Sequence, residues 1–365
     1  MNSLPKQRLP LMGMAILLLL AAMWAGLVRI GWAWPALQPS LPMAHGPLMV
    51  SGFLGALISL ERAVAIERRW GYGAPLLAGL GGLLVMIGAP GWLGPLLISL
   101  ASLLLVAIFG VILRMHAALY TWVIALGAVL WAVGNLLWLL GWPLHVVVWW
   151  WAGFLVLTIA GERLELSRLL RLSGQTMALF LGAAGLFLAG ILWASFDYSS
   201  GVRLVGVGMI ALSAWLLRYD IAQRRLKAGG LARFIALSLL SGYVWLAVSG
   251  LLALLRGGVV AGPVYDAMLH ALFLGHVFTM IFGHAPIIFP AVLGLPIHYS
   301  PRFYSHLILL HLTLLLRLAG DLLGWQTGRL WGGLLNVVVL LLFLVNTVAS
   351  MRAGPGERGQ AQPAP

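Results

Sequence analysis

Six of the nine histidines in this chain lie between His270 and His311. Three of them, His270, His276 and His284, occur in one apolar stretch, LHALFLGHVFTMIFGHAPIIFP. An ionisable side chain is costly to place in a bilayer, so its presence there indicates a functional site. Neutral imidazole is also the commonest metal ligand. These histidines could therefore bind a metal ion or haem, relay protons, or only form hydrogen bonds between packed helices.

A second apolar segment, AHGPLMVSGFLGALISLERA, also begins with a histidine. His45 and Met49 are four residues apart, so on a helix both side chains face one site. The glycines of this segment would let a flat macrocycle or another helix approach closely: Gly46, Gly52 and Gly55. In the later stretch, His276, Met280 and His284 share one helix face by the same spacing. His270 projects elsewhere, because six residues turn a helix through about 240°.

The composition assigns the chain to integral membrane proteins. Hydrophobic residues make up 62% of its 365 residues and charged residues only 8%, whereas soluble domains have about 25% charged residues. The net charge of +13 would suit nucleic acid, but the basic residues lie in short loops between apolar segments, where they orient a membrane protein. We therefore expect membrane lipid around the chain and no nucleic-acid partner. The absence of cysteine excludes thiolate zinc sites, iron–sulfur clusters and covalently attached haem.

Apolar segments near the ~20 residues that a helix needs to span a bilayer predict an all-α, twelve-helix polytopic bundle. They cover 11–34, 45–66, 74–91, 93–113, 119–141, 143–160, 176–197, 201–219, 232–254, 263–285, 302–324 and 328–350. Pro286 and Pro290 are expected to break the tenth helix. The predicted organisation is a cytoplasmic N-terminus at 1–10, a transmembrane domain at 11–350 and a disordered cytoplasmic tail at 351–365.

The basic residues orient this bundle with both termini in the cytoplasm, since positive charge favours that side. Only five of the 22 Lys and Arg residues then fall on the opposite side: Arg29, Arg203, Arg256, Arg317 and Arg329. The same topology sorts the histidines by depth. His45, His145, His270 and His276 would lie in the outer half, and the remaining histidines, apart from the deeper His311, toward the cytoplasmic side: His116, His284, His298 and His306.

For most of these histidines, hydrogen bonding to a neighbouring helix is the simpler interpretation, and it applies to His116, His145, His298 and His306. The candidate cofactor-binding residues are His45, His270, His276, Met49 and Arg317, and the candidate metal ligands are His45, His270, His276 and His284. Arg317 and Asp321 are four residues apart and could form an internal ion pair. Alternatively, Arg317 could neutralise a haem propionate, because arginine presents a planar fork to carboxylates.

The later motif resembles that of the NnrS family, twelve-helix membrane proteins associated with denitrification and nitric oxide stress and regarded as containing haem and copper. The resemblance rests on the run His270-Ala271-Leu272, on Gly275, on Thr279-Met280 and on Gly283-His284. The early segment with His45-Gly46, Met49 and Gly52-Phe53 is similar to the family's first histidine motif, and also to the second helix of haem–copper oxidase subunit I. The oxidases need an adjacent His-His pair, which this chain lacks.

The resemblance implies a multi-pass protein of the cell inner membrane that binds b-type haem non-covalently, with copper as a possible second metal. His45 and His270 would be the axial ligands, and His276 or His284 would serve a second site. Nitric oxide or another diatomic molecule would be the ligand, in nitric oxide or respiratory redox metabolism. Whether the protein is an enzyme stays open. The alternatives are a secondary transporter with twelve spans and an accessory subunit whose histidines are structural.

Overall fold

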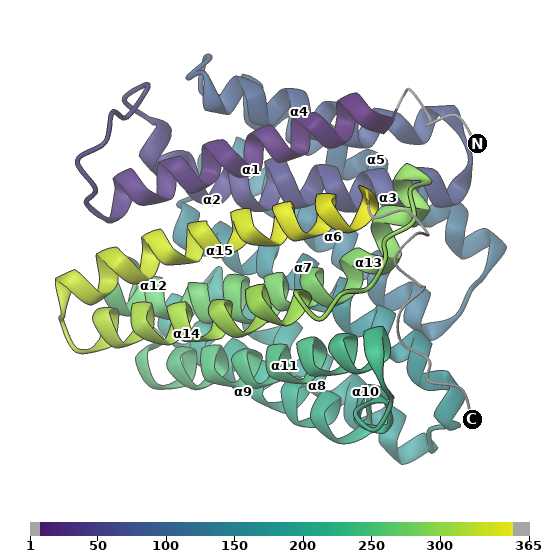
Figure 1. The fold of residues 1–365 in the computed structure, drawn as a ribbon. Helices are drawn as coiled ribbons and strands as arrows, with labels where there is room; N and C mark the ends of the chain where they lie inside the picture. The colour runs from purple at the N-terminus through teal and green to yellow at the C-terminus, as the bar shows by residue number, and fades with distance from the viewer. Residues whose placement is uncertain (1–7, 353–365) are drawn as a thin grey trace.

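The computed structural model describes residues 8–352 (Figure 1), and every regular element among them is helical. This confirms the predicted all-α class. The long helices are α1 (Arg8–Ile30), α5 (Leu93–Met115), α6 (Leu119–Leu139), α7 (Leu144–Ser167), α8 (Gly174–Ala194), α9 (Tyr198–Tyr219), α11 (Gly230–Arg256), α14 (Phe303–Leu322) and α15 (Gln326–Arg352). Two further spans are interrupted helices. One joins η1 (Leu41–Ala44), α2 (His45–Pro47), η2 (Leu48–Leu54) and α3 (Gly55–Ile66), and the other joins α12 (Pro263–His270), η5 (Ala271–Phe278) and α13 (Thr279–Leu293). The short elements are η3 (Arg69–Tyr72), η4 (Arg168–Leu170) and α10 (Ala222–Arg225).

Eleven helices in the described part of the chain are long and apolar enough to cross a membrane, so the chain is a polytopic membrane protein. The predicted third span, 74–91, is the exception. It forms α4 (Gly73–Met86), whose 14 residues rise about 21 Å, less than the ~30 Å of a hydrocarbon core. The helix stops there because Gly88 takes a left-handed conformation and Pro90 follows. α4 nevertheless packs against α1 and α5 inside the bundle.

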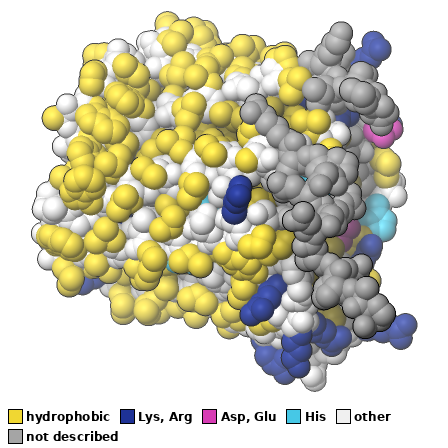
Figure 2. Space-filling model, viewed as in Figure 1, with side chains coloured by type: hydrophobic (Ala, Val, Ile, Leu, Met, Phe, Trp, Pro, Cys, Tyr) yellow, Lys and Arg dark blue, Asp and Glu magenta, His cyan; other side chains and the backbone are white. Residues whose placement is uncertain are grey.

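The bundle has one basic end. α1 begins and α15 ends at this end, on the right in Figure 1. Figure 2 shows Lys and Arg side chains gathered toward it, while hydrophobic side chains cover the flank. Of the predicted terminal segments, residues 1–7 and 353–365 lie outside the described part of the chain; only the start of the predicted tail is described, as the last turn of α15.

The two interrupted helices share an unusual feature. Each contains a π-helical segment, η2 or η5, that begins within three residues of a histidine, His45 or His270. Such wide turns occur frequently at functional sites. The expectation that Pro286 and Pro290 end the helix was wrong, because α13 continues through both to Leu293. Prolines are tolerated within membrane helices where neighbouring groups satisfy the freed carbonyls.

Near the basic end, a buried ion pair joins α7 to the start of the loop after α9. Arg163 donates to both carboxylate oxygens of Asp220, at 2.7 and 2.8 Å, and the Tyr243 hydroxyl of α11 donates to the same carboxylate at 2.8 Å. All three side chains are buried. The network therefore connects three helices. If one partner is lost, the buried groups that remain have no water to replace it.

We predict that Asp220→Ala destabilises the protein by about 3–5 kcal/mol, because it leaves the buried Arg163 charge unpaired. Tyr243→Phe removes one hydrogen bond to the pair and should cost about 1–3 kcal/mol. Thermal unfolding of the purified protein in detergent measures both effects. Asp197→Ala, which removes an exposed carboxylate that caps α9, is the control and should cost clearly less stability than Asp220→Ala. Equal losses for Asp197→Ala and Asp220→Ala would contradict the prediction.

Candidate functional site

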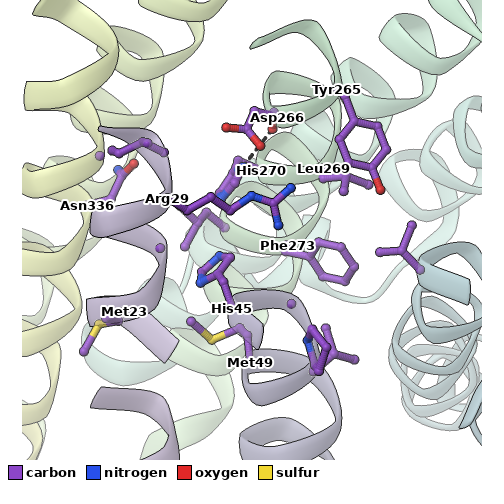
Figure 3. Close-up of a pocket in the computed structure, with 18 of the residues that line it drawn as sticks. Met23, Arg29, His45, Met49, Tyr265, Asp266, Leu269, His270, Phe273 and Asn336 are labelled. Atoms are coloured by element: carbon purple, nitrogen blue, oxygen red, sulfur yellow. Dashed lines mark hydrogen bonds between the residues drawn. The ribbon is translucent and has the colours of Figure 1, made fainter. Parts of the chain in front are cut away.

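A cavity of about 390 Å³ lies at the end of the bundle opposite the basic end, and we call it the outer cavity. Its walls come from α1, from α2 and η2, from α7, from α12 and η5, and from α14 and α15. Most of the lining is apolar. The polar lining residues are Arg29, His45, His145, Asp266, His270, Arg317 and Asn336, several of which are labelled in Figure 3.

His45 enters this cavity from the first turn of its span, where α1 fixes its ring. The Nδ1 atom lies 2.7 Å from the carbonyl oxygen of Ala22. Because a carbonyl can only accept, Nδ1 must carry the proton, and the Nε2 atom of the neutral ring then has a free lone pair. The close approach needs Gly26, since a Cβ at that position would lie 2.8 Å from His45 Nδ1.

His270 is oriented in the same way by its own helix. Its Nδ1 atom donates to the Asp266 carbonyl oxygen one turn earlier, at 2.8 Å. The rings of His45 and His270 are nearly parallel, with an angle of 15° between their planes and 6.0 Å between their centroids. Neither Nε2 atom has a hydrogen-bond partner within residues 8–352. The structure therefore brings together two imidazoles whose lone pairs are free to bind a ligand.

Four charged side chains form a cluster beside these rings. Arg329 donates to the Asp266 carboxylate at 2.7 Å and lies 2.8 Å from that of Asp321. Arg317 sits farther from the same two carboxylates, at 3.7 and 3.9 Å. The predicted Arg317–Asp321 ion pair is thus one contact of a balanced set of two arginines and two aspartates. Because Arg317 is the looser partner and lines the cavity, its guanidinium can also bind an anion there.

Arg29 adds a further positive charge at the cavity rim. Its side chain projects from α1 across the front of the cavity in Figure 3, and it forms no ion pair with another described residue. Sequence reasoning did not select Arg29, Asp266 or Arg329 for this site. Asp266 carried one usable signal, because it precedes His270 by four residues and so lies on the same helix face. Arg29 reaches the cavity from α1, and Arg329 reaches the Asp266 carboxylate from α15; nothing in the local sequence indicates either position.

The other candidate ligands lie elsewhere, apart from Met49, which lines the outer cavity. His276 is fully buried against α11, where its Nδ1 atom lies 3.0 Å from the Gly242 carbonyl oxygen. His284 faces a separate, deeper cavity. The predicted sharing of one face by His276 and His284 therefore does not produce one site. Residues 8–352 contain no group of three or more His, Asp or Glu side chains that could hold a metal ion.

The remaining histidines contact neighbouring helices or loops. His145 lines the outer cavity but packs edge-on against Tyr198, with 4.8 Å between ring centroids. His306 lies between aromatic rings, one of them Phe282. The other three each have a polar partner: Tyr120 for His116, the Ser350 carbonyl for His298 and the Trp245 indole for His311. The interpretation of His116, His298 and His306 as packing residues agrees with these contacts.

We predict that Gly26→Ala destabilises the protein by about 1–3 kcal/mol, because the added methyl group overpacks the contact with the His45 ring. Gly13→Ala is the matched control on the same helix, since a Cβ there has no atom within 4 Å. That change should be neutral or stabilising by up to about 1 kcal/mol. The apparent melting temperature in detergent tests both changes. If Gly26→Ala melts at the same temperature as Gly13→Ala, or at a higher one, the contact between Gly26 and the His45 ring is not tight and the prediction is wrong.

Comparison with known proteins gives the chain a family but no activity. No curated protein matches it. A family described as a domain of unknown function, DUF8744, matches residues 8–352, which is the whole of the described bundle. The chain is therefore a member of the DUF8744 family, and its outer cavity with His45 and His270 is a feature of a membrane-embedded domain of that family.

Proposed function

We propose that this protein binds b-type haem in the outer cavity, with His45 and His270 as axial ligands, and acts in nitric oxide or respiratory redox metabolism as an NnrS-like membrane protein. The observation that carries the proposal is the pair of imidazoles, each with Nδ1 bound to a backbone carbonyl and Nε2 free. Metal-ligating histidines almost always donate their second ring N–H in this way, which fixes the tautomer and raises the basicity of the ligand nitrogen.

The spacing of the rings fits a shared metal ion. Two imidazoles that bind one ion from opposite sides at about 2.0–2.1 Å have ring centroids on the order of 6 Å apart. The observed separation of His45 and His270 is 6.0 Å. The distance matches, but the two rings are stacked, so ligation of one ion by both would require the rings to turn until each Nε2 atom faces it.

The walls fit the rest of a macrocycle. Met49, Phe273 and Phe278 give an apolar lining, and Gly46 leaves open space beside His45, because a Cβ there would meet no atom within 4 Å. Haem carries two propionates, and the cavity offers the guanidinium groups of Arg29 and Arg317. Arginine pairs with carboxylates by two parallel hydrogen bonds. The donor set is thus complete for a haem held without covalent attachment.

The arrangement of the histidines also bears on the chemistry. Bound haem would supply an iron that changes oxidation state. If His45 and His270 both held the group, the chemistry it would supply is electron transfer more than binding of a diatomic molecule. The Ala22 carbonyl of α1 would orient His45 for this role, and the Asp266 carbonyl of its own helix would orient His270.

Copper is not part of this proposal. His276 and His284 were the candidate residues for a second metal, and they lie apart from each other and from the outer cavity.

We place the protein in the cell inner membrane with its basic end in the cytoplasm. The support is the distribution of Lys and Arg, of which 17 of 22 are assigned to one side when all twelve apolar segments alternate. The short α4 counts as one of these passages, because α1 begins and α15 ends at the same end of the bundle. The outer cavity then faces the opposite compartment. A secondary transporter is the second candidate function, because a further cavity lies deeper on the same helices.

Absorbance of the purified protein tests the haem proposal. We expect a Soret band that shifts on reduction and that His45→Ala and His270→Ala each abolish or strongly reduce, because each removes one axial ligand. His145→Ala is the matched control, since this imidazole lines the same cavity but packs against Tyr198, and it should keep the band.

Two outcomes would refute haem ligation by this pair. One is a colourless preparation that takes up no added haem, which would favour the transporter. The other is a Soret band of unchanged intensity in both His45→Ala and His270→Ala. Melting curves of the same preparations distinguish lost ligation from lost folding.

A further inference from the structure

A second cavity of about 80 Å³, which we call the inner cavity, lies deeper in the bundle toward the basic end. It is lined by α1, by η2 and α3, by α7, and by η5 and α13, and of these α1, η2, α7 and η5 also line the outer cavity. On η2 and α7 the lining passes from outer to inner residues within about one turn. On η2 it passes from Val50 to Leu54, and on α7 from Trp151 to Leu155. The two cavities therefore form one column along the bundle axis.

The inner cavity is apolar except for four side chains, which are Glu61, Thr158, Glu162 and His284. His284 Nδ1 donates to the Met280 carbonyl oxygen at 2.7 Å, which leaves the Nε2 lone pair free. Thr158 is 95% buried, and its hydroxyl has no hydrogen-bond partner among residues 8–352. Buried polar groups without protein partners are commonly satisfied by internal water, and the volume is sufficient for a few water molecules.

The charges around this cavity do not balance. Arg62 pairs with Glu162 and lies 3.7 Å from Glu61, so one guanidinium faces two carboxylates. Arg163 is already paired with Asp220. Glu165, three residues after Glu162 on α7, adds a further negative charge. The side chains of Glu61 and Glu162 are 26% and 23% exposed, and two carboxylates that share one guanidinium can be neutralised by a single proton.

A pair of aromatic rings separates the two cavities. Phe53 of η2 and Phe278 of η5 stack at 6.2 Å between centroids, with 21° between their planes. Each is eight residues beyond a histidine of the outer cavity, so the ring pairs His45–His270 and Phe53–Phe278 occur at matching positions on two parallel spans. Both phenylalanines are buried, so the contact between the two rings is apolar.

We propose that the inner cavity is a proton-binding site, in which Glu61 and Glu162, which share Arg62, hold one proton taken up from the basic end of the bundle while His284 lines the same cavity, and that Phe53 and Phe278 are the barrier between this site and the outer cavity. Chains of carboxylates and histidines within membrane spans are a recurrent means of proton relay. The proposal does not depend on haem in the outer cavity, because it uses neither His45 nor His270.

Proton flux into proteoliposomes tests the barrier and the site together. A potassium diffusion potential set by valinomycin drives protons inward, and an internal pH dye reports them. We expect wild-type protein to give a slow flux and Phe53→Ala to raise it several-fold, because the smaller side chain joins the two cavities. Adding Glu162→Gln to Phe53→Ala should return the flux to the wild-type level.

Phe343→Ala is the matched control, since Phe343 is similarly buried and stacks on Phe282 away from both cavities. It should leave the flux unchanged. The proposal is overturned if Phe53→Ala leaks no more than Phe343→Ala, or if its leak persists with Glu162→Gln.

Infrared difference spectra give a second measurement that needs no barrier variant. During a pH titration, intact protein should show the C=O stretch of one protonated carboxyl group that exchanges with deuterium, and Glu162→Gln should abolish it. Glu67→Gln, which removes an exposed carboxylate, should retain the band. A band that survives Glu162→Gln would assign the proton to another group and reject the site.

Discussion

An imidazole inside a bilayer must find partners for two ring nitrogens without help from water, and in this bundle the backbone satisfies only one of them. His45, His270 and His284 each direct Nδ1 to a main-chain carbonyl and turn Nε2 into a cavity. This pattern fixes the tautomer of each ring, because a carbonyl cannot donate. The free lone pairs, and whatever binds them, are a consequence of this single constraint.

Two interrupted spans carry this arrangement through the membrane. In each, a phenylalanine within the π-helical segment lies eight residues after the histidine, and the two spans face each other with His45 against His270 and Phe53 against Phe278. The wide π-helical turns re-aim side chains that a regular α-helix would place on another face. This pair of spans thereby carries two histidines of the outer cavity, the stacked phenylalanines and part of the lining of the deeper, mainly apolar cavity in sequence along the axis.

Each of the two cavities has charged side chains beside it, and at each of them one sign of charge is in excess. The cluster beside the outer cavity balances Arg317 and Arg329 against Asp266 and Asp321, which leaves Arg29 as the extra positive charge for an anionic ligand. The inner cavity has the opposite excess, because Arg62 faces both Glu61 and Glu162. Arg29 is exposed at the rim of the outer cavity, and Glu61 and Glu162 are partly exposed at the inner one, so an anionic ligand can reach the first excess charge and a proton the second.

The sequence by itself determined that the chain is a membrane protein, that its fold is all-α and which histidines are candidates for a site. Long apolar segments with little charge can only be membrane helices, and the glycines and histidine of the 41–66 span were visible as a pattern. Local sequence could not decide that α4 stops at Met86 or that α13 continues past Pro290, since neighbouring helices control both. Only tertiary structure could separate His276 from His284, bring Arg29 and Arg329 to the site, and set two imidazoles 6.0 Å apart. Such distances depend on how distant segments pack, and side-chain spacing along one helix contains no information about its neighbour.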